Sequence, residues 1–462
     1  MLIELERALP SGAVVTDPDV RESYGHDESE TPPCLPDAVV RARSTSDVVA
    51  VMRAASAHRV PVTPRSGGTG RTGGAVPVAG GIVLAFEGME RILEIDRDDL
   101  VAVVEPGVVT GVLHETVQAE GLFYPPDPNS LESCRLGGNV AENAGGPRAF
   151  KYGVTREYVL GLEVVTADGT VLELGKRTVK GVTGYDLTAL VVGSEGTLAV
   201  VTRATLSLLP LPERVVTMLV LLPDMAAVGR AVTAATTSRV VPRCVELLDE
   251  HTLALVRPLV AVAIPPGARA MLLVELDGDE LATDAELERC GTAFTEAGAL
   301  DVLVARHGGD RDKLWAARRE LSHALRRTAK FKLSEDIVVP RSQIGTLIDR
   351  ARAISERTGI RMPTYGHAGD GNLHVNFLWD DPAERPTVEK AIEALFREVV
   401  ALRGTLSGEH GIGVLKAPYL ALEQSPELIS LQERIKSLFD PHHILNPGKI
   451  FPTDARRFHR AC

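Results

Sequence analysis

The sequence lacks paired cysteines, long apolar runs and an excess of basic residues. Its five cysteines, at positions 34, 134, 244, 290 and 462, include no Cys-x-x-Cys pair. This scatter argues against a disulfide scaffold, a zinc ribbon and an iron–sulfur cluster, and it favours a reducing cytoplasm. If the chain transfers electrons, it therefore needs another carrier or partner to take them onward.

The absence of long apolar runs and of a basic surface argues against a membrane-spanning or nucleic-acid-binding protein. The most apolar window, residues 253–264, is interrupted by Arg257 and Pro258, so we expect no transmembrane span. The net charge of −12 and the absence of a basic stripe disfavour nucleic-acid binding. The opening segment, MLIELERALPSG, is acidic and amphipathic, unlike a secretion signal. What remains is a soluble globular protein.

A chain of 462 residues is too long for one ordinary core, and its texture changes along its length. Residues 35–210 are rich in Gly, Val and Pro and predict short elements: a helix from Ser44–Asp47 to about His58, strands at 60–63, 81–86 and 101–107, a helix at 112–121, and a hairpin at 162–174. From about residue 213, alanine-rich helices alternate with strands such as 216–222 and 271–276. We predict three parts: 1–212, 213–430 and a C-terminal segment, 431–462.

Residues 64–74, PRSGGTGRTGG, contain a G-x-G-x-x-G pattern at Gly68, Gly70 and Gly73. A Rossmann interpretation fails because such a loop must open a helix, whereas the next residues favour loop and strand. Successive glycines still allow several backbone N–H groups to face one anion, although a flexible hairpin loop is the alternative. Three more such segments, 125–130, 134–153 and 191–202, favour a shared ligand site.

Together the four segments resemble the flavin domain of the vanillyl-alcohol oxidase superfamily, whose FAD lies between two α+β subdomains. The resemblance implies that the first loop wraps the pyrophosphate through Arg65, Ser66, Gly67, Gly68, Thr69 and Gly70, and that Pro64 also belongs to the cofactor site. It implies a flavin lined by Pro126, Ser130, Gly137, Gly138, Asn143, Gly145 and Gly146. It places the adenine and ribose beside Gly193, Glu195, Gly196 and Val200. Some relatives bind the flavin covalently through a histidine of the first loop; residues 64–74 contain none, so we expect noncovalent FAD.

Residues 366–376, GHAGDGNLHVN, hold two histidines seven positions apart, His367 and His374. One continuous strand would send them to opposite faces, and Gly-Asp-Gly does not sustain a helix. The rings can converge only if Gly369-Asp370-Gly371 makes a tight turn, with Asp370 as a turn residue. A second segment, SGEHGIG at 407–413, offers Glu409 and His410. Two histidines and a carboxylate suit zinc, manganese, cobalt or iron, although turn residues and a solvated loop would look the same.

With FDPHHILNPGKIFP at 439–452, these segments are similar to the FAD-linked 2-hydroxyacid dehydrogenases, which include D-lactate dehydrogenase, D-2-hydroxyglutarate dehydrogenase and the flavoprotein subunit of glycolate oxidase. The resemblance implies an α+β fold: a two-subdomain FAD domain, a substrate (cap) domain on an antiparallel sheet, and a C-terminal segment that returns to the flavin. It assigns the metal, zinc first among the candidates, to His367, His374 and Glu409. It assigns the substrate to His410, Arg318 and Asn376, and further flavin contacts to Asn446 and Lys449.

This implied reaction fits the residue types. Oxidation of an α-hydroxy acid removes the hydroxyl proton and moves a hydride from Cα to flavin N5. A divalent metal lowers the pKa of a bound hydroxyl, and His410 is a suitable general base. Arg318 would supply the fork for the substrate carboxylate. The alternative for this arginine is a solvated helix face shared with Arg319, Arg326 and Arg327.

The substrate is less defined than the reaction. In dehydrogenases for 2-hydroxyglutarate, a threonine and a lysine of this region hold the distal carboxylate; here Ser322 and Ser334 occupy those positions, with Lys332 two residues away. We therefore expect D-lactate, glycolate or a similar D-2-hydroxy acid, with D-2-hydroxyglutarate as an alternative.

The sequence does not specify the electron acceptor, the assembly state or the cellular location. The electron acceptor would be a quinone, a cytochrome, an electron-transfer flavoprotein or an iron–sulfur subunit. The chain could also be the flavoprotein subunit of a glycolate oxidase complex or a homodimer, in the cytoplasm or peripheral at the inner face of the membrane. A non-heme iron oxygenase with the same triad would leave the glycine loops unexplained, and a flavin subunit without catalysis would be expected to lose the His/Glu cluster.

Overall fold

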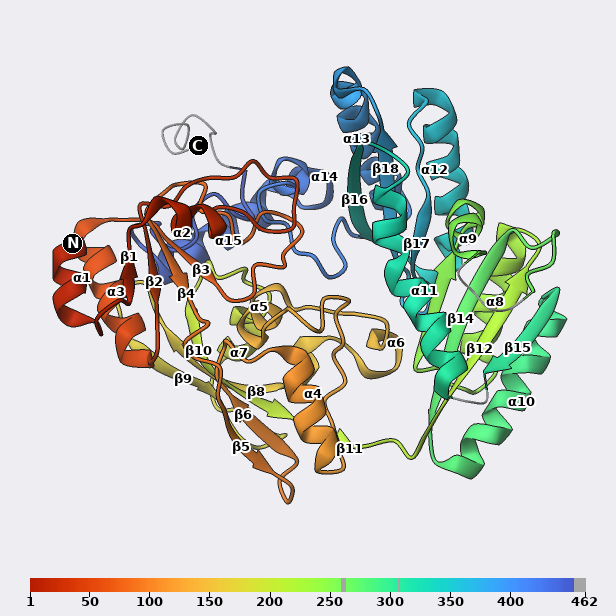
Figure 1. The fold of residues 1–462 in the computed structure, drawn as a ribbon, viewed down its shortest axis with the longest axis horizontal. Coiled ribbons are helices and arrows are strands. Elements are labelled where there is room, and N and C mark those ends of the chain that lie inside the picture. The colour runs from red at the N-terminus through yellow and green to blue at the C-terminus, as the bar shows by residue number, and fades with distance from the viewer. Residues whose placement is uncertain (259–262, 306–307, 453–462) are drawn as a thin grey trace. The chain divides into compact units, whose positions relative to one another are not determined.

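The computed structural model describes residues 1–258, 263–305 and 308–452, and the chain divides into two compact units. Unit 1 comprises Met1–Gly145, Val154–Leu211 and the chain from Glu409 onward; unit 2 comprises Gly146–Gly153 and Pro212–Gly408 (Figure 1). The chain thus passes between the units four times. Along the part of the chain that the structure describes, no helix is both long and apolar enough to cross a membrane.

Unit 1 begins with a small mixed sheet of order β1-β2-β4-β3, formed by Val14–Val15, Ala38–Arg41, Ile82–Ala85 and Val62–Arg65. Strands β2, β4 and β3 run parallel, so their carboxyl ends meet at one edge. The predicted first helix is confirmed as α3, Thr45–His58, whose N-terminus is capped by Ser44. Its apolar face, with Val51 and Met52, packs into a core that also includes the C-terminal residues Ile444 and Leu445.

The second sheet of unit 1 is antiparallel, of order β5-β6-β10-β8-β9. Its strands are Ile92–Asp96, Val101–Val104, Val200–Ser207, Val159–Val165 and Val171–Gly175. The last two form the predicted hairpin, whose turn includes Asp168 and Gly169. A two-strand ribbon joins β7, Leu122–Phe123, to β11, Leu209–Pro210.

Short helices cover these sheets and hold the predicted cofactor segments. They are α1 (Leu2–Ala8), α2 (Pro18–Ser23), α4 (Thr110–Ala119), α5 (Leu136–Glu142), α7 (Leu187–Val191), α14 (Leu420–Glu423), α15 (Pro426–Phe439) and the 3-10 turns Thr155–Tyr158 and Ala417–Tyr419. The first glycine loop follows β3 and contains no helix, which agrees with the rejection of a Rossmann fold.

Unit 2 is built on one antiparallel sheet of seven strands, order β15-β12-β14-β13-β17-β18-β16. The strands are Asp301–Ala305, Arg214–Leu222, Ala270–Gly278, Cys244–Leu248, Thr364–His367, Asn372–Trp379 and Phe331–Val338. Continuous apolar runs form β12 and β14, which are buried on both faces.

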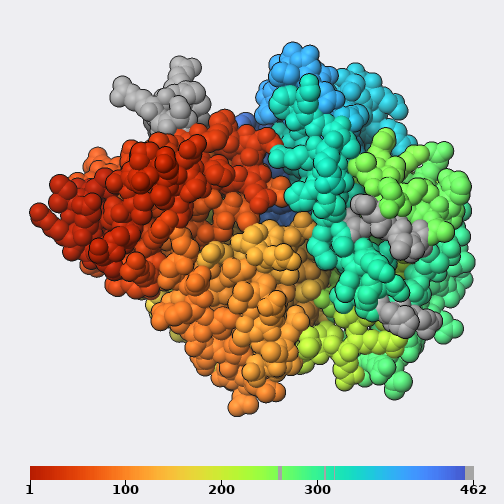
Figure 2. All heavy atoms as spheres, viewed as in Figure 1, coloured from red at the N-terminus to blue at the C-terminus, as the bar shows by residue number. Residues whose placement is uncertain are grey.

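The helices of unit 2 are α6 (Ala149–Tyr152), α8 (Met225–Thr237), α9 (Glu250–Val256), α10 (Glu280–Glu296), α11 (Gly308–Arg326), α12 (Ile344–Thr358), α13 (Arg385–Ala401) and the 3-10 turns Arg341–Gln343 and Pro382–Glu384. Helices α9 and α11 pack on the face that carries Leu248 and Leu273. Figure 2 shows α11, in teal, along the surface of unit 2. α11 therefore covers part of one face of the unit 2 sheet.

The predicted division after residue 430 differs from the structure, in which residues 409–430 belong to unit 1. The reason lies in the backbone of the SGEHGIG segment. The amides of Ile412 and Gly413 both donate to the buried carboxylate of Glu195, and Val414 N donates to Thr72 O at 2.8 Å. The chain returns to unit 1 as soon as it reaches Glu409, about twenty residues earlier than its composition indicates.

Candidate active site

Polar side chains line one face of the unit 2 sheet across four neighbouring strands. The register pairs Glu246 with His367, His367 with Asn372, and Asp336 with His374. Residues directly opposite each other in antiparallel strands point to the same side of the sheet. These residues are at most 7% exposed. A sheet face this buried holds polar groups only if they are bonded to one another or to a ligand.

The two histidines converge across a tight turn, as predicted. Strands β17 and β18 pair in antiparallel fashion, and Gly371 N donates to His367 O at 3.1 Å. Asn372 N donates to the Asp370 carboxylate at 3.1 Å, which confirms Asp370 as a turn residue. Gly371 has φ 87° and its Cα faces Val339 O so closely that no β-carbon would fit. The rings of His367 and His374 lie 5.3 Å apart, nearly perpendicular.

Glu246 bonds both His367 and Arg318. One carboxylate oxygen lies 2.5 Å from Nδ1 of His367, and the other lies 2.7 Å from Nε and 2.6 Å from Nη2 of Arg318. Burial alone would raise the pKa of Glu246, but the positive charges and hydrogen bonds of His367 and Arg318 hold it at about 2. The carboxylate is therefore ionised near neutral pH.

Arg318 is not part of a solvated helix face. It is 6% exposed, and its guanidinium carbon lies 4.7 Å from the ring centre of Tyr365, whereas Arg319 and Arg326 of the same helix are exposed. The tetrad of Glu246, His367, His374 and Arg318, with Tyr365 beside it, therefore forms one contiguous cluster.

Asn376, predicted to face the substrate, lies two residues beyond His374 on the same face of β18. Its side chain is fully buried, and Nδ2 donates to the carbonyls of Pro363 and His374. Its Oδ1 atom has no hydrogen-bond partner among the residues that the structure describes. A buried amide oxygen left open in this way suits a ligand that donates a hydrogen bond.

Asp336 was missed by sequence reasoning, as was Glu246. Asp336 is fully buried and accepts hydrogen bonds from Asn372 Nδ2, from Ser407 Oγ at 3.1 Å and from Gly408 N at 2.9 Å. Asp336 therefore ties Ser407 and Gly408, the residues just before Glu409, to β16, the strand paired with the His374 strand β18. The acidic residues at 335 and 336 in a β-rich segment were the available signal, but their direction depends on a register that composition does not supply.

In unit 1, the predicted cofactor segments converge. A β-carbon at Gly138 would lie 3.7 Å from Ser66 Cβ, and one at Gly67 would lie 3.0 Å from Ser133 O. A β-carbon at Gly196 would lie 3.4 Å from Pro64 Cγ, and one at Gly193 would lie 3.2 Å from Asn143 Cβ. Backbone segments that approach this closely can surround a ligand with N–H groups rather than side chains.

The C-terminal LNPGK motif joins the same region. Asn446 Nδ2 donates to Gly74 O at 3.0 Å and to Glu195 O at 2.7 Å, and its buried Oδ1 has no partner among the described residues. Lys449 Nζ donates to Val76 O at 2.7 Å. Burial lowers the pKa of Lys449 to about 8, although neighbouring carboxylates oppose the shift. The first glycine loop, residues 193–196 (the GSEG segment) and LNPGK thus meet in one place. The buried Oδ1 of Asn446 there can accept a hydrogen bond from a bound ligand.

The remaining predicted residues take the following positions. Glu195 binds the amides of Ile412 and Gly413, so its carboxylate is engaged inside the protein. Pro126 is buried and its carbonyl lies 2.9 Å from His114 Nε2. Glu409 lies beside Gly145, where a β-carbon would be 2.9 Å from its carboxylate; Gly146 begins the segment that belongs to unit 2. Ser130, Gly137, Thr69, Gly70 and Val200 lie in unit 1, and their contacts with FAD stay predictions.

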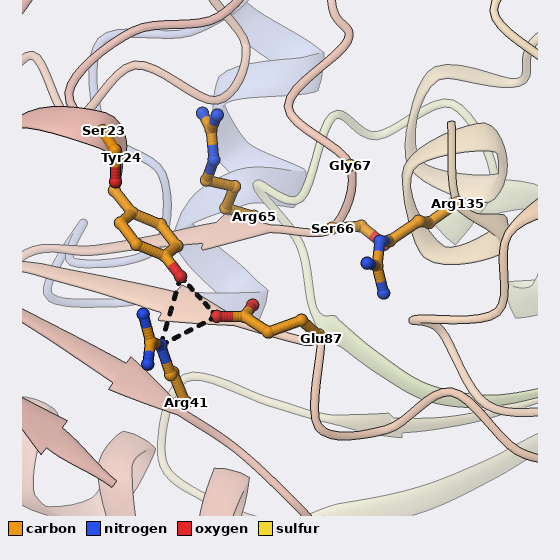
Figure 3. Close-up of a pocket in the computed structure, with 8 residues that line it drawn as sticks. All are labelled: Ser23, Tyr24, Arg41, Arg65, Ser66, Gly67, Glu87 and Arg135. Atoms are coloured by element: carbon orange, nitrogen blue, oxygen red, sulfur yellow. Dashed lines mark hydrogen bonds and ion pairs between the residues drawn. The ribbon is translucent and has the colours of Figure 1, made fainter. Parts of the chain in front are cut away.

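A pocket of about 380 Å³ opens at the carboxyl ends of the parallel strands β2, β3 and β4. Arg41, Arg65 and Arg135 line it, with one acidic side chain, Glu87 (Figure 3). Arg41 pairs with Glu87 at 3.0 Å and Tyr24 bonds the same carboxylate. The excess of guanidinium groups in an acidic chain suits an anion, and the predicted pyrophosphate residues Arg65, Ser66 and Gly67 form one wall.

Two family models match separate parts of this chain. Residues 36–175 match the family described as FAD binding domain, and residues 211–450 match FAD linked oxidases, C-terminal domain. The chain is 41% identical to "Glycolate oxidase subunit GlcD" of Bacillus subtilis, over 94% of this chain and 93% of that protein. It is 33% identical to "D-lactate dehydrogenase" of Anaerostipes hadrus, over 97% of each.

Among solved structures, p-cresol methylhydroxylase with bound substrate superposes with a TM-score of 0.82 at 18% identity, covering 97% of this chain and 96% of that one. This confirms the predicted fold, an FAD-binding domain of vanillyl-alcohol oxidase type with a second α+β domain. The chain belongs to the FAD-linked 2-hydroxyacid dehydrogenases.

Proposed function

We propose that this protein oxidises a D-2-hydroxy acid, such as D-lactate or glycolate, to the 2-oxo acid with noncovalent FAD and a divalent metal. The observation that carries the proposal is the buried cluster of His367, His374 and Arg318 on one sheet face. It combines two imidazole ligands with a fixed cation for a carboxylate, in a chain whose family binds FAD.

The proposed metal ligands are His367, His374 and Glu409. Glu409 directly follows Gly408, whose amide is bonded to Asp336, the cross-strand neighbour of His374. Two imidazoles and one carboxylate leave coordination positions open, and this set suits zinc, with manganese, cobalt and iron as alternatives. When bound, such a metal lowers the pKa of a coordinated hydroxyl.

The proposed substrate contacts divide the work among three side chains. Arg318 uses Nε and Nη2 for Glu246, and Nη1 contacts no carboxylate among the described residues, so one edge of the guanidinium can bind a substrate carboxylate. Asn376 offers the open Oδ1 atom. His410 would accept the hydroxyl proton; its backbone is held by Thr72 Oγ1, 3.0 Å from His410 O.

The glycine segments of unit 1 would hold FAD, which would supply the hydride acceptor for oxidation at the substrate Cα. The convergence of the first loop, the GSEG segment and LNPGK supports this placement. The reduced flavin would pass electrons to a quinone, a cytochrome, an electron-transfer flavoprotein or an iron–sulfur subunit. The proposed setting is the cytoplasm or the inner face of the membrane, as a homodimer or as a subunit of a larger oxidase.

One observation favours D-2-hydroxyglutarate as an alternative substrate. Lys332 is 8% exposed and its Nζ donates to Ser322 Oγ at 2.9 Å. Its strand position lies two residues from Ser334, which pairs with Asn376, so Lys332 is on the same face as the cluster. A lysine held there could bind a distal carboxylate.

Anaerobic bleaching of the flavin across a panel of D- and L-2-hydroxy acids tests the proposal. D-Lactate or glycolate should bleach the flavin, and metal-free protein should do so at least about 100-fold more slowly, a loss of about 3 kcal/mol of transition-state stabilisation. Bleaching by D-2-hydroxyglutarate that Lys332→Met abolishes would establish the alternative. If chelated protein, verified metal-free, bleaches at the original rate, the metal role is wrong; bleaching only by L-acids would refute the stereochemistry.

A further inference from the structure

The carboxylate of Glu246 lies between His367, a proposed metal ligand, and Arg318, the proposed binding group for the substrate carboxylate. It is fully buried at the centre of β13, directly across the strand pair from His367. Its Oε1 atom faces His367 Nδ1 at 2.5 Å, and its Oε2 atom faces Arg318 Nε and Nη2 at 2.7 and 2.6 Å. Among the described residues, no other carboxylate bonds Arg318.

The contact with His367 selects one form of the imidazole. A carboxylate only accepts hydrogen bonds, so Nδ1 carries the proton and donates. In a neutral ring the lone pair is then at Nε2, the nitrogen through which this ring could bind a metal. A carboxylate behind a metal-binding histidine also raises the basicity of the ring and fixes its orientation.

The contact with Arg318 restrains the guanidinium from its side. Nε and Nη2 face Glu246, while the planar group lies over the ring of Tyr365 at 4.7 Å. Tyr365 is itself the cross-strand partner of His374, and the two rings are 5.3 Å apart. Glu246 and Tyr365 thus fix the orientation of the Arg318 guanidinium. The edge that carries Nη1 therefore has a fixed direction before a substrate binds.

We propose that Glu246 is a positioning residue that sets His367 for the metal and Arg318 for the substrate carboxylate at the same time. This inference rests on the proposed function and goes beyond it, because it links metal affinity and substrate affinity through one side chain. A single carboxylate keeps the metal ligand and the anion-binding arginine in a constant relation, whichever 2-hydroxy acid is bound.

Glu275 offers a matched control on the neighbouring strand β14. It is 2% exposed, lies on the same sheet face and binds Arg311 and Trp315 of α11, the helix that also carries Arg318. Glu275→Gln therefore removes a buried, paired carboxylate that anchors α11, and it leaves the cluster intact.

The first measurement is calorimetric titration of Zn²⁺ and Mn²⁺ into chelator-treated protein. Glu246→Gln should weaken metal binding about 10- to 100-fold, whereas Glu275→Gln should stay within about twofold of wild type. Glu246→Asp, which keeps the charge but shortens the side chain, should recover part of the lost metal affinity. It replaces Glu246→Gln as the test variant if the Gln variant does not fold. Equal metal affinity for Glu246→Gln and Glu275→Gln would overturn the inference while the proposed function stands.

The second measurement is a double-mutant cycle on the KM for D-lactate. Glu246→Gln should raise KM in the wild-type background but not in Arg318→Met, whereas its effect on metal affinity should persist there. Additive effects on KM would refute the link to Arg318. If wild-type protein binds neither Zn²⁺ nor Mn²⁺, both the metal part of the proposed function and this role of Glu246 are refuted. If it binds metal but does not oxidise D-lactate, only the proposed substrate is refuted. In that case the metal titration still decides the role of Glu246.

Discussion

Replacing Lys436 by methionine should destabilise unit 1 and weaken its cofactor site. Lys436 lies in the last turn of α15 and is 7% exposed. Its Nζ donates to Thr197 O at 2.7 Å, to Leu445 O at 2.8 Å and to the Asp440 carboxylate at 2.5 Å. Asp440 in turn accepts from the amides of Ile444 and Leu445. The pair therefore holds the chain that leads into LNPGK.

The expected magnitude follows from what the substitution leaves behind. Methionine fills the space of the lysine stem, but Asp440 loses its cation and two buried carbonyls lose their donor. Breaking one partner of a buried pair costs about 3–5 kcal/mol. At roughly 2–4 °C per kcal/mol for a domain of this size, the midpoint of thermal unfolding should fall by roughly 6–20 °C. FAD should also bind more weakly, since Asn446 directly follows Leu445.

Thermal unfolding by circular dichroism and titration of FAD into FAD-free protein measure both effects. Arg434→Met, at an exposed position of the same helix, is the control and should stay within about 2 °C, the change expected for up to about 0.5 kcal/mol. The double variant Lys436→Met/Asp440→Asn should lose less than Lys436→Met, because it also removes the uncompensated charge. A midpoint unchanged in the single variant, or a double variant that is worse, would refute the reasoning.

Three further predictions concern other buried groups. Lys151→Met should cost about 1–3 kcal/mol and speed proteolysis within residues 146–153, because Lys151 Nζ lies 2.6 Å from the buried Asp277 carboxylate; equal cleavage rates would contradict this. Burial, followed by the charge of Glu195, raises the pKa of Glu142, so the fold retains a proton that the unfolded chain releases above about pH 4.3, and stability should fall as pH rises from there. Glu142→Gln should therefore gain stability relative to wild type as pH rises from about 5 to about 8 in FAD-free protein, and a difference independent of pH would show the direction to be wrong. Arg318→Lys should lower kcat/KM by about 10- to 150-fold, since lysine cannot replace a forked contact worth about 1.5–3 kcal/mol; full activity would remove the arginine from the site.

Local chemistry made part of this structure predictable. The Gly-Asp-Gly turn could be identified from residue types alone, because only a turn there lets His367 and His374 meet. The Ser44 cap and the apolar runs of β12 and β14 likewise depend on neighbours in the sequence. The order of the glycine segments predicted their shared purpose, since each would be unremarkable alone.

What could not be predicted depends on pairing across long stretches of chain. Glu246 is 121 residues from His367, and only the strand order β13-β17 makes them neighbours. The division at residue 408 instead of 430 follows from a contact between Ile412 and Glu195, 217 residues away. Four arginines of one helix look alike in sequence, and the burial of Arg318 is decided by the sheet beneath it.

The path of the chain through the two units bears on how the protein is made. Unit 2 is complete once Gly408 has been synthesised, whereas unit 1 still lacks the residues that extend its first sheet: Val62 N donates to Ile444 O, and Asn446 N donates to Val62 O. On the ribosome, the second unit can therefore finish folding while the first waits for its last strand partner. A truncation that removes residues 444–449 should therefore leave unit 2 folded, whereas the first sheet of unit 1 would lack its partner at Leu445.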